Sequence, residues 1–339
     1  MPTPSGFSAC DTASMTSLLI VLAMPEAVVA RYYDRLRAAF PELEINAVDH
    51  RDKIGPYIGR AEILLTFGAM MRDDVYRQAP RLQWVQALGT GVDRIIDAPS
   101  LGPAVIVTNI HGVHGPPVAE GAVAAMLALA RQLPRSLRAQ ERRAWERFPV
   151  RLLDGKTVAV LGIGVIAAAL GPRCKALGMR VVGISSAPRD VPGFDRIHPR
   201  AALIETVRDC DFLVLLTPHT AATHHIVDAA VLAALKPGCC LVNLARGGVV
   251  DEDALVRALA EDRIAGAALD VFSTEPLPQD HPFWAMKNVI MTPHLGGFYD
   301  EYPEQVLPVV EENIRRFLAG DRAHMINIVS RADAAGKAP

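Results

Sequence analysis

The sequence has little cysteine, no excess of charge of one sign and no apolar run long enough to span a bilayer. Its five cysteines are scattered and show no CxxC spacing, which argues against a zinc site or a redox pair and favours a reducing, cytoplasmic setting. The net charge is −2, and no block of Lys or Arg could follow a phosphate backbone, so nucleic acid is not an expected partner. The apolar run at residues 18–24 is too short to cross a membrane and predicts a buried strand instead.

Apolar and polar stretches alternate along the chain as parallel sheets covered by helices require. Half of the 339 residues are apolar, and this length favours two domains. The first unit has predicted strands at residues 18–22, 44–47, 63–66, 84–87 and 105–108. The small, polar residues 1–16 and the tail after Arg331 are expected to be loosely held.

A long helix is predicted to open at Pro116 and Pro117 and to lead into a second unit, because the first turn of a helix accepts proline. Six strands are predicted there, at residues 157–161, 180–184, 212–216, 240–243, 266–269 and 289–291. An amphipathic helix over residues 304–318 is expected to return to the first unit. The predicted fold is a doubly wound α/β protein. A Rossmann-type cofactor domain, residues 114–298, is inserted in a flavodoxin-like substrate domain, residues 1–113 and 299–339.

A glycine turn follows the first strand of the second unit. Gly162 permits a tight turn, and Gly164 lets the backbone approach a pyrophosphate without a Cβ in the way. Ala167 allows close packing of the next helix, whose free amides favour an anion. The residues predicted to hold a dinucleotide are Gly162, Ile163, Gly164, Val165 and Ile166. The alternative is a strand-to-helix turn of the same spacing that binds no ligand.

The end of the next strand bears on the choice of cofactor. NAD-binding proteins normally have an acidic residue there, but this chain has Ser185 and Ser186, followed by Arg189. No carboxylate would repel a 2′-phosphate, and a guanidinium can bind one. NADP is therefore favoured, and NAD is the alternative if Arg189 is an ordinary surface residue.

Three ionisable residues follow the last three predicted strands: Arg246, Glu275 and His294, in that order. Because the carboxyl ends of parallel strands face the ligand crevice, these side chains are expected to meet there. A guanidinium can clamp a carboxylate, an imidazole can protonate a developing alkoxide, and a carboxylate on the other ring nitrogen fixes the tautomer. Each residue alone could be an ordinary loop residue, but the three together predict hydride transfer to a 2-keto acid.

With these motifs, the sequence resembles the D-isomer-specific 2-hydroxyacid dehydrogenases, which include glyoxylate and hydroxypyruvate reductases, phosphoglycerate dehydrogenase and D-lactate dehydrogenase. The resemblance covers residues 63–317 and is most specific at residues 162–167, 243–255, 268–278 and 292–297. It implies an NAD(P)-dependent oxidoreductase for a small 2-keto or 2-hydroxy acid, foremost of the glyoxylate/hydroxypyruvate class. It also implies a homodimer, because the helix over residues 118–129 resembles the dimer arm of the family.

The resemblance also implies roles for single residues. Arg246 would bind and polarise the substrate, His294 would be acid and base, and Glu275 would orient His294. Asp270 would hold the nicotinamide carboxamide, and Val118 would lie near the nicotinamide face. The further residues implied at the cofactor are Pro218, Ala245 and Gly296, and those implied in loops that meet the substrate carboxylate are Phe67, Gly68, Gly89, Thr90 and Gly91.

The chain departs from the family pattern in three places. Ala167 replaces the third glycine, Val165 replaces a basic residue, and residues 296–299 follow the catalytic His with Gly-Gly-Phe-Tyr where many members have Ala-Gly. The last change can reshape the substrate pocket, so the resemblance does not fix the substrate.

Formate dehydrogenases have the same architecture but pair their His with Gln, so Glu275 argues against that function. A phosphite-type dehydrogenase and a corepressor-like protein that only senses NAD stay open as alternatives. No metal is expected, because neither His111 with His114 nor His224 with His225 has a carboxylate or thiolate cluster beside it.

Overall fold

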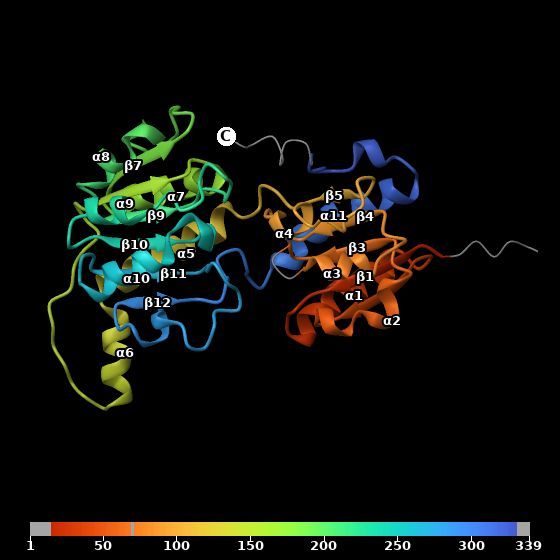
Figure 1. Ribbon diagram of the computed structural model, residues 1–339, viewed down its shortest axis with the longest axis horizontal. Coiled ribbons are helices and arrows are strands. Elements are labelled where there is room, and N and C mark those ends of the chain that lie inside the picture. The colour runs from red at the N-terminus through yellow and green to blue at the C-terminus, as the bar shows by residue number, and fades with distance from the viewer. Residues whose placement is uncertain (1–14, 69–70, 331–339) are drawn as a thin grey trace, which may run out of the picture. The chain divides into compact units, whose positions relative to one another are not determined.

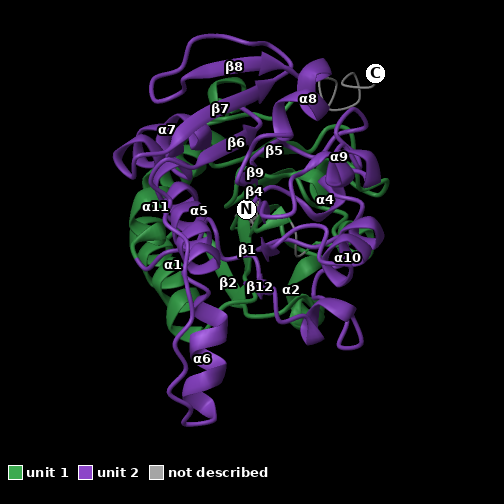
Figure 2. Ribbon diagram, turned by 90° about the vertical axis from the view of Figure 1, so that its left-hand side faces the viewer, with its two compact units in different colours: residues 1–111, 301–331 green, residues 112–300, 332–339 purple. Residues whose placement is uncertain are grey.

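The chain forms two compact units, seen in a computed structural model that describes residues 15–68 and 71–330 (Figures 1 and 2). Unit 1 comprises residues 1–111 and 301–331, and unit 2 comprises residues 112–300 and 332–339. Of the end segments expected to be loosely held, residues 1–14 and the whole tail after Arg331 lie outside the described residues. Among the described helices, none combines the length and apolar character needed to cross a bilayer.

Unit 1 is built on a five-stranded parallel sheet in the order β2-β1-β3-β4-β5, which is the flavodoxin-like order. The central strands are buried along their whole length, which explains why their sequences are mainly apolar. Helix α11 belongs to this unit, where its Phe317 stacks on Trp84 with ring centroids 5.5 Å apart. The elements are β1 (Ser17–Val21), α1 (Glu26–Ala39), β2 (Glu44–Val48), α2 (Gly55–Ile58), β3 (Ile63–Thr66), α3 (Asp73–Arg77), β4 (Trp84–Ala87), α4 (Asp93–Ile96), β5 (Ile106–Thr108) and α11 (Tyr302–Leu318).

Unit 2 is built on a seven-stranded parallel sheet in the order β12-β11-β10-β9-β6-β7-β8. Read from β8, this is the Rossmann order 3-2-1-4-5-6 with a further strand. Helices α5 and α7 pack on one face and α8, α9 and α10 on the other, each over its own apolar core. The elements are α5 (Gly115–Ala130), α6 (Leu133–Glu141), β6 (Thr157–Leu161), α7 (Val165–Ala176), β7 (Arg180–Ser185), β8 (Arg196–Pro199), α8 (Leu203–Val207), β9 (Phe212–Leu215), α9 (Ala229–Ala234), β10 (Cys240–Asn243), α10 (Glu252–Ala260), β11 (Gly266–Leu269) and β12 (Val289–Met291).

The predicted fold class is confirmed, and each predicted strand is present to within one residue at either end. The prediction of six strands in the second unit was wrong, because β8 makes a seventh. Strand β8 has the sequence Arg-Ile-His-Pro and is only half-buried at the edge of the sheet, so it lacks the apolar run that marked the other strands.

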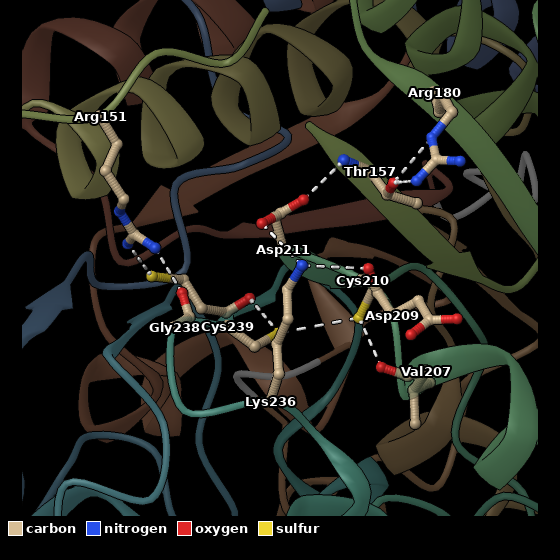
Figure 3. Close-up of polar contacts among 11 residues, drawn as sticks. Arg151, Thr157, Arg180, Val207, Asp209, Cys210, Asp211, Lys236, Gly238 and Cys239 are labelled. Atoms are coloured by element: carbon tan, nitrogen blue, oxygen red, sulfur yellow. Dashed lines mark hydrogen bonds and ion pairs between the residues drawn. The ribbon is translucent and has the colours of Figure 1, made fainter. Parts of the chain in front are cut away.

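Polar contacts join the amino-terminal ends of the unit 2 strands, opposite the ends that carry the predicted site (Figure 3). Asp211 accepts a hydrogen bond from the Thr157 amide at 2.8 Å and pairs with Lys236 at 2.8 Å. Burial raises the pKa of Asp211, but these contacts together hold it below its ordinary value. Two cysteines that sequence spacing did not connect also meet here, with the Sγ atoms of Cys210 and Cys239 3.7 Å apart. The amino-terminal ends of these strands are therefore held together by contacts within the protein.

Candidate active site

His294 and Glu275 form a hydrogen-bonded pair at the carboxyl ends of neighbouring strands. His294 Nδ1 lies 2.9 Å from Glu275 Oε2, and Glu275 Oε1 accepts a hydrogen bond from the Phe272 amide at 2.9 Å. The His294 side chain is 34% exposed and that of Glu275 22%, so the pair is partly shielded from water. Since Nδ1 faces the carboxylate, Nε2 is the ring nitrogen left to exchange a proton with another molecule.

Glu275 is held in its charged form. Burial raises its pKa, but the hydrogen bond and charge of His294, the Phe272 amide and the charge of Arg246 together bring the pKa below its ordinary value. A carboxylate that stays ionised can accept the Nδ1 proton and stabilise a positive charge on the ring. The positive charge of Arg246 also lowers the pKa of this carboxylate, by less than the contacts of His294 do.

The turn that carries His294 is fastened by Asp270, the residue after β11. The Asp270 carboxylate accepts hydrogen bonds from Thr292 Oγ1 at 2.5 Å and from the Leu295 and Gly296 amides at 2.7 and 2.8 Å. The Asp270 carbonyl oxygen also accepts from the His294 amide at 2.8 Å. These contacts hold His294 at a φ of 57°, a left-handed conformation that side chains other than Asn, Asp and His rarely adopt. The Asp270 carboxylate therefore holds the His294 turn in place. Its implied role at the nicotinamide stays a prediction.

The loop that carries Arg246 is fastened by Asn243, the last residue of β10. Asn243 Oδ1 accepts a hydrogen bond from the Ala245 amide at 3.0 Å, and its Nδ2 donates to the Arg246 carbonyl at 3.1 Å. The Arg246 guanidinium donates to the Ala245 carbonyl at 2.7 Å. Strands β10, β11 and β12 are adjacent in the sheet, so Arg246, Glu275 and His294 come from three neighbouring strand ends, as the sequence pattern predicts.

The glycine turn between β6 and α7 has the shape of a phosphate-binding loop. Gly162 has a φ of +100°, and a Cβ there would lie 2.5 Å from the Thr217 amide nitrogen, so only glycine fits. A Cβ on Gly164 would have no atom within 4 Å, so the protein leaves open space in front of this residue. Helix α7 then begins at Val165 without a side-chain cap, which leaves its first amides for an anion. The turn therefore fits the pyrophosphate of a dinucleotide.

Arg189 lies against this turn, where its Nη2 donates to the Ile163 carbonyl at 2.8 Å. Ser185 ends β7, and its hydroxyl caps the following bend through the Ala187 amide at 3.2 Å. A serine and a guanidinium thus stand beside the glycine turn where an acidic residue would serve NAD.

The loops predicted to meet the substrate carboxylate lie together in unit 1. Gly68 follows β3, and a Cβ on it would lie 2.8 Å from the Gly91 carbonyl oxygen. The Phe67 ring approaches Gly89, and Thr90 Oγ1 donates to the Ile110 carbonyl at 2.8 Å. These residues gather at the carboxyl ends of β3 and β4. Their role toward a substrate stays a prediction, as do the roles of Val118, Pro218, Ala245 and Gly296 in unit 2.

Within residues 15–68 and 71–330, no three His, Cys, Asp or Glu side chains are grouped so as to hold a metal ion.

Comparison with known proteins places the chain in a family. Residues 123–296 match the family model described as "D-isomer specific 2-hydroxyacid dehydrogenase, NAD binding domain". The chain is 34% identical over 289 residues to the D-3-phosphoglycerate dehydrogenase of Methanocaldococcus jannaschii, a match that covers 84% of this chain and 55% of that protein. It thus spans about half the length of the phosphoglycerate dehydrogenases that it matches.

Two other similar proteins match over most of both chains. The glyoxylate reductase of Korarchaeum cryptofilum is 33% identical over 254 residues, covering 73% of this chain and 76% of that protein. A D-isomer specific 2-hydroxyacid dehydrogenase from Xanthobacter autotrophicus Py2, solved in complex with NADPH and MES, superposes with a TM-score of 0.75 at 31% identity. That superposition covers 95% of this chain and 100% of the solved one.

Proposed function

The chain belongs to the D-isomer specific 2-hydroxyacid dehydrogenase family, and we propose that it transfers hydride between NAD(P)H and a small 2-keto acid to give the D-2-hydroxy acid. The observation that carries this proposal is the pair of His294 Nδ1 and Glu275 Oε2 at 2.9 Å, with the Arg246 charge acting on the same carboxylate. A proton donor and a carboxylate-binding cation are what reduction of a keto acid needs beyond the cofactor.

Each residue of the pair then has a defined task. The reduced nicotinamide supplies the hydride when it is bound. Arg246 binds the substrate carboxylate and polarises the keto oxygen, while His294 donates the proton of Nε2 to that oxygen as negative charge develops there. Glu275 keeps the Nδ1 proton in place and stabilises the charged ring before the transfer, so the ring stays in the tautomer and orientation that the reaction requires.

The preferred cofactor in this proposal is NADP. Its pyrophosphate would be held by residues 162–166, where Gly164 leaves open space and α7 presents its first amides. Arg189, bonded to the Ile163 carbonyl beside this turn, would bind the 2′-phosphate, and Ser185 and Ser186 would face the ribose without repelling it. The NADPH in the Xanthobacter structure supports this choice.

The proposed substrate class is that of glyoxylate and hydroxypyruvate. Both are small 2-keto acids that a single guanidinium and a pair of backbone loops can bind through the carboxylate. The similarity to a glyoxylate reductase over about three quarters of each chain supports this class over the phosphoglycerate class, whose members match this chain over about half of their own length.

We also propose that the chain works as a homodimer. Helix α6 and the segment that follows it extend from the body of unit 2 (Figures 1 and 2), and they expose large apolar side chains, including Trp145 at 91% and Leu152 at 61%. The helix over residues 118–129, on which the sequence-based expectation of a dimer rests, lies in α5, where Ala122 and Met126 are buried in the core of unit 2. The exposed apolar side chains of the later segment are therefore the ones that a second copy of the chain is expected to cover. Light scattering tests this: a mass of twice 36.6 kDa supports the dimer, and the monomer mass contradicts it.

The four free thiols of the described chain favour a reducing, cytoplasmic compartment.

The activity is tested with two panels. Keto acids, glyoxylate and hydroxypyruvate first, are assayed with NADH and NADPH by the loss of absorbance of the reduced nicotinamide, and 2-hydroxy acids and phosphite are assayed with NAD and NADP by its gain. Reduction of at least one keto acid is expected, and the glycerate formed from hydroxypyruvate should be the D-isomer; glycolate, formed from glyoxylate, has no stereocentre. Tight cofactor binding without turnover of any 2-keto acid, 2-hydroxy acid or phosphite would instead indicate a protein that only senses the cofactor, and phosphite oxidation alone would indicate the phosphite-type alternative.

A further inference from the structure

A carboxylate outside the pair of His294 and Glu275 holds the turn on which Glu275 depends. Glu252 Oε1 accepts a hydrogen bond from the Ser273 amide at 2.7 Å. The neighbouring amide, that of Phe272, donates to Glu275 Oε1 at 2.9 Å. Two consecutive amides of one turn are therefore held by two different glutamates, one of which is the partner of His294.

The same peptide unit rests on the loop of Arg246. A Cβ on Gly247 would lie 1.9 Å from the Phe272 carbonyl carbon and 2.1 Å from the Ser273 nitrogen, so the two backbones touch and only glycine fits. Gly247 directly follows Arg246. The peptide between Phe272 and Ser273 thus contacts Gly247 and is hydrogen-bonded to Glu252, so the loop that bears Arg246 and the turn that bears Glu275 are in direct backbone contact.

Glu252 is not needed to cap its own helix. It is the first residue of α10, and the cap of that helix is Asp251, whose Oδ1 accepts a hydrogen bond from the Ala254 amide at 3.0 Å. Asp253, the next residue, carries the same charge in the same first turn but is exposed. Glu252 and Asp253 are therefore a matched pair for substitution. Both carboxylates interact favourably with the dipole of α10, and Glu252 in addition accepts the hydrogen bond of the Ser273 amide.

We propose that Glu252 is a positioning residue for the reaction: it fixes the Ser273 amide, and through this turn it keeps Glu275 on Nδ1 of His294 beside Arg246. The catalytic part of this inference rests on the proposed function, whereas the positioning of the His294 ring does not. The contact of Glu252 is with the Ser273 amide and not with His294 or Arg246.

The variants that test this are Glu252→Ala and Glu252→Asp, with Glu252→Gln and Asp253→Ala as controls. Alanine lacks the acceptor, and aspartate keeps the charge but is one methylene too short, so both are expected to lower kcat about tenfold, as for a displaced catalytic group. Glutamine keeps an acceptor oxygen and should stay within about threefold of the wild type, and Asp253→Ala within about twofold. In a Glu275→Gln background, Glu252→Ala should add less than about twofold, because it acts through Glu275.

A second measurement does not depend on activity. In protein labelled with ¹⁵N-histidine, the His294 ring signals, identified by their loss in His294→Asn, report the hydrogen bond at Nδ1. We expect them to change in Glu252→Ala and Glu252→Asp and to be unchanged in Asp253→Ala. Unchanged ring signals in both Glu252 variants would overturn the inference, as would an equal loss of kcat in Asp253→Ala. A wild-type protein that reduces no substrate would contradict the proposed function only, since the ring signals still test Glu252.

Discussion

The substitution Gly164→Ala separates cofactor binding from folding with a single methyl group. The backbone at Gly164 has φ −116° and ψ −160°, which alanine adopts without strain, and a Cβ there meets no protein atom within 4 Å. Gly→Ala at a compatible position stabilises a protein by about 0.4 to 1 kcal/mol through the unfolded chain. The melting temperature should therefore stay constant or rise by about 1 to 4 °C.

The effect on cofactor affinity should have the opposite sign. If a pyrophosphate approaches the turn as proposed, the methyl group enters the space that the phosphate oxygens need. Forcing one methyl group into a packed contact costs about 1 to 3 kcal/mol. Since 1.4 kcal/mol is a factor of ten, the Kd for NADPH should rise by about 5- to 150-fold.

The assay is a titration of NADPH followed by its fluorescence, with thermal denaturation of the same samples. Gly121→Ala is the matched control, because a Cβ on this α5 residue also meets no atom within 4 Å but lies outside the glycine turn. That variant should keep the wild-type Kd. A Gly164→Ala protein that melts normally and binds NADPH within twofold of the wild type would refute the placement of the pyrophosphate.

Two further predictions concern charged residues of the site. Arg189→Ala should raise the KM for NADPH about tenfold and leave that for NADH within twofold, as expected for the loss of one charge-assisted contact to a phosphate. Steady-state kinetics with both cofactors measure this. Equal changes in KM for the two cofactors would mean that Arg189 does not bind the 2′-phosphate. Glu275→Gln should lower kcat about 10- to 150-fold, since a hydrogen bond to a charged group contributes about 1.5 to 3 kcal/mol. The pKa of Glu275 is lowered in the folded protein, so the carboxylate stabilises the fold fully above its unfolded pKa of about 4.3 and this contribution is lost as the pH falls through the folded value. The melting temperatures of wild type and Glu275→Gln should therefore differ above the unfolded pKa and converge as the pH falls through the lowered pKa of Glu275, and a difference that stays unchanged at the most acidic pH would contradict the ionised pair.

Sequence patterns predicted the strands well because most strands of the two sheets are buried on both faces and must be continuously apolar. Strand β8, which was not predicted, is the exception. It pairs with β7 at the sheet edge, where Arg196 and His198 are tolerated because little of the strand is buried. An edge strand has hydrogen bonds but no apolar signature, so periodicity does not reveal it.

The pairing of His294 with Glu275 was predictable because strand order places successive strand ends at one edge of a parallel sheet. Glu252 was not predictable, because its partner is the Ser273 amide 21 positions away and the contact depends on where α10 begins. Asp270 shows the same limit. The resemblance implies contact with the nicotinamide, and the structure shows in addition that the Asp270 carboxylate accepts hydrogen bonds from three donors of the His294 turn.

The central claim, that His294 supplies the proton in keto acid reduction, is tested most directly by kcat of His294→Asn with the keto acid that the wild type reduces fastest. Asparagine tolerates the φ of 57° at this position, so the turn is expected to keep its shape. A loss of about a hundredfold to ten-thousandfold in kcat with an unchanged Kd for NADPH is predicted, the usual range for a lost acid or base. Turnover of this variant at the wild-type rate would contradict the account.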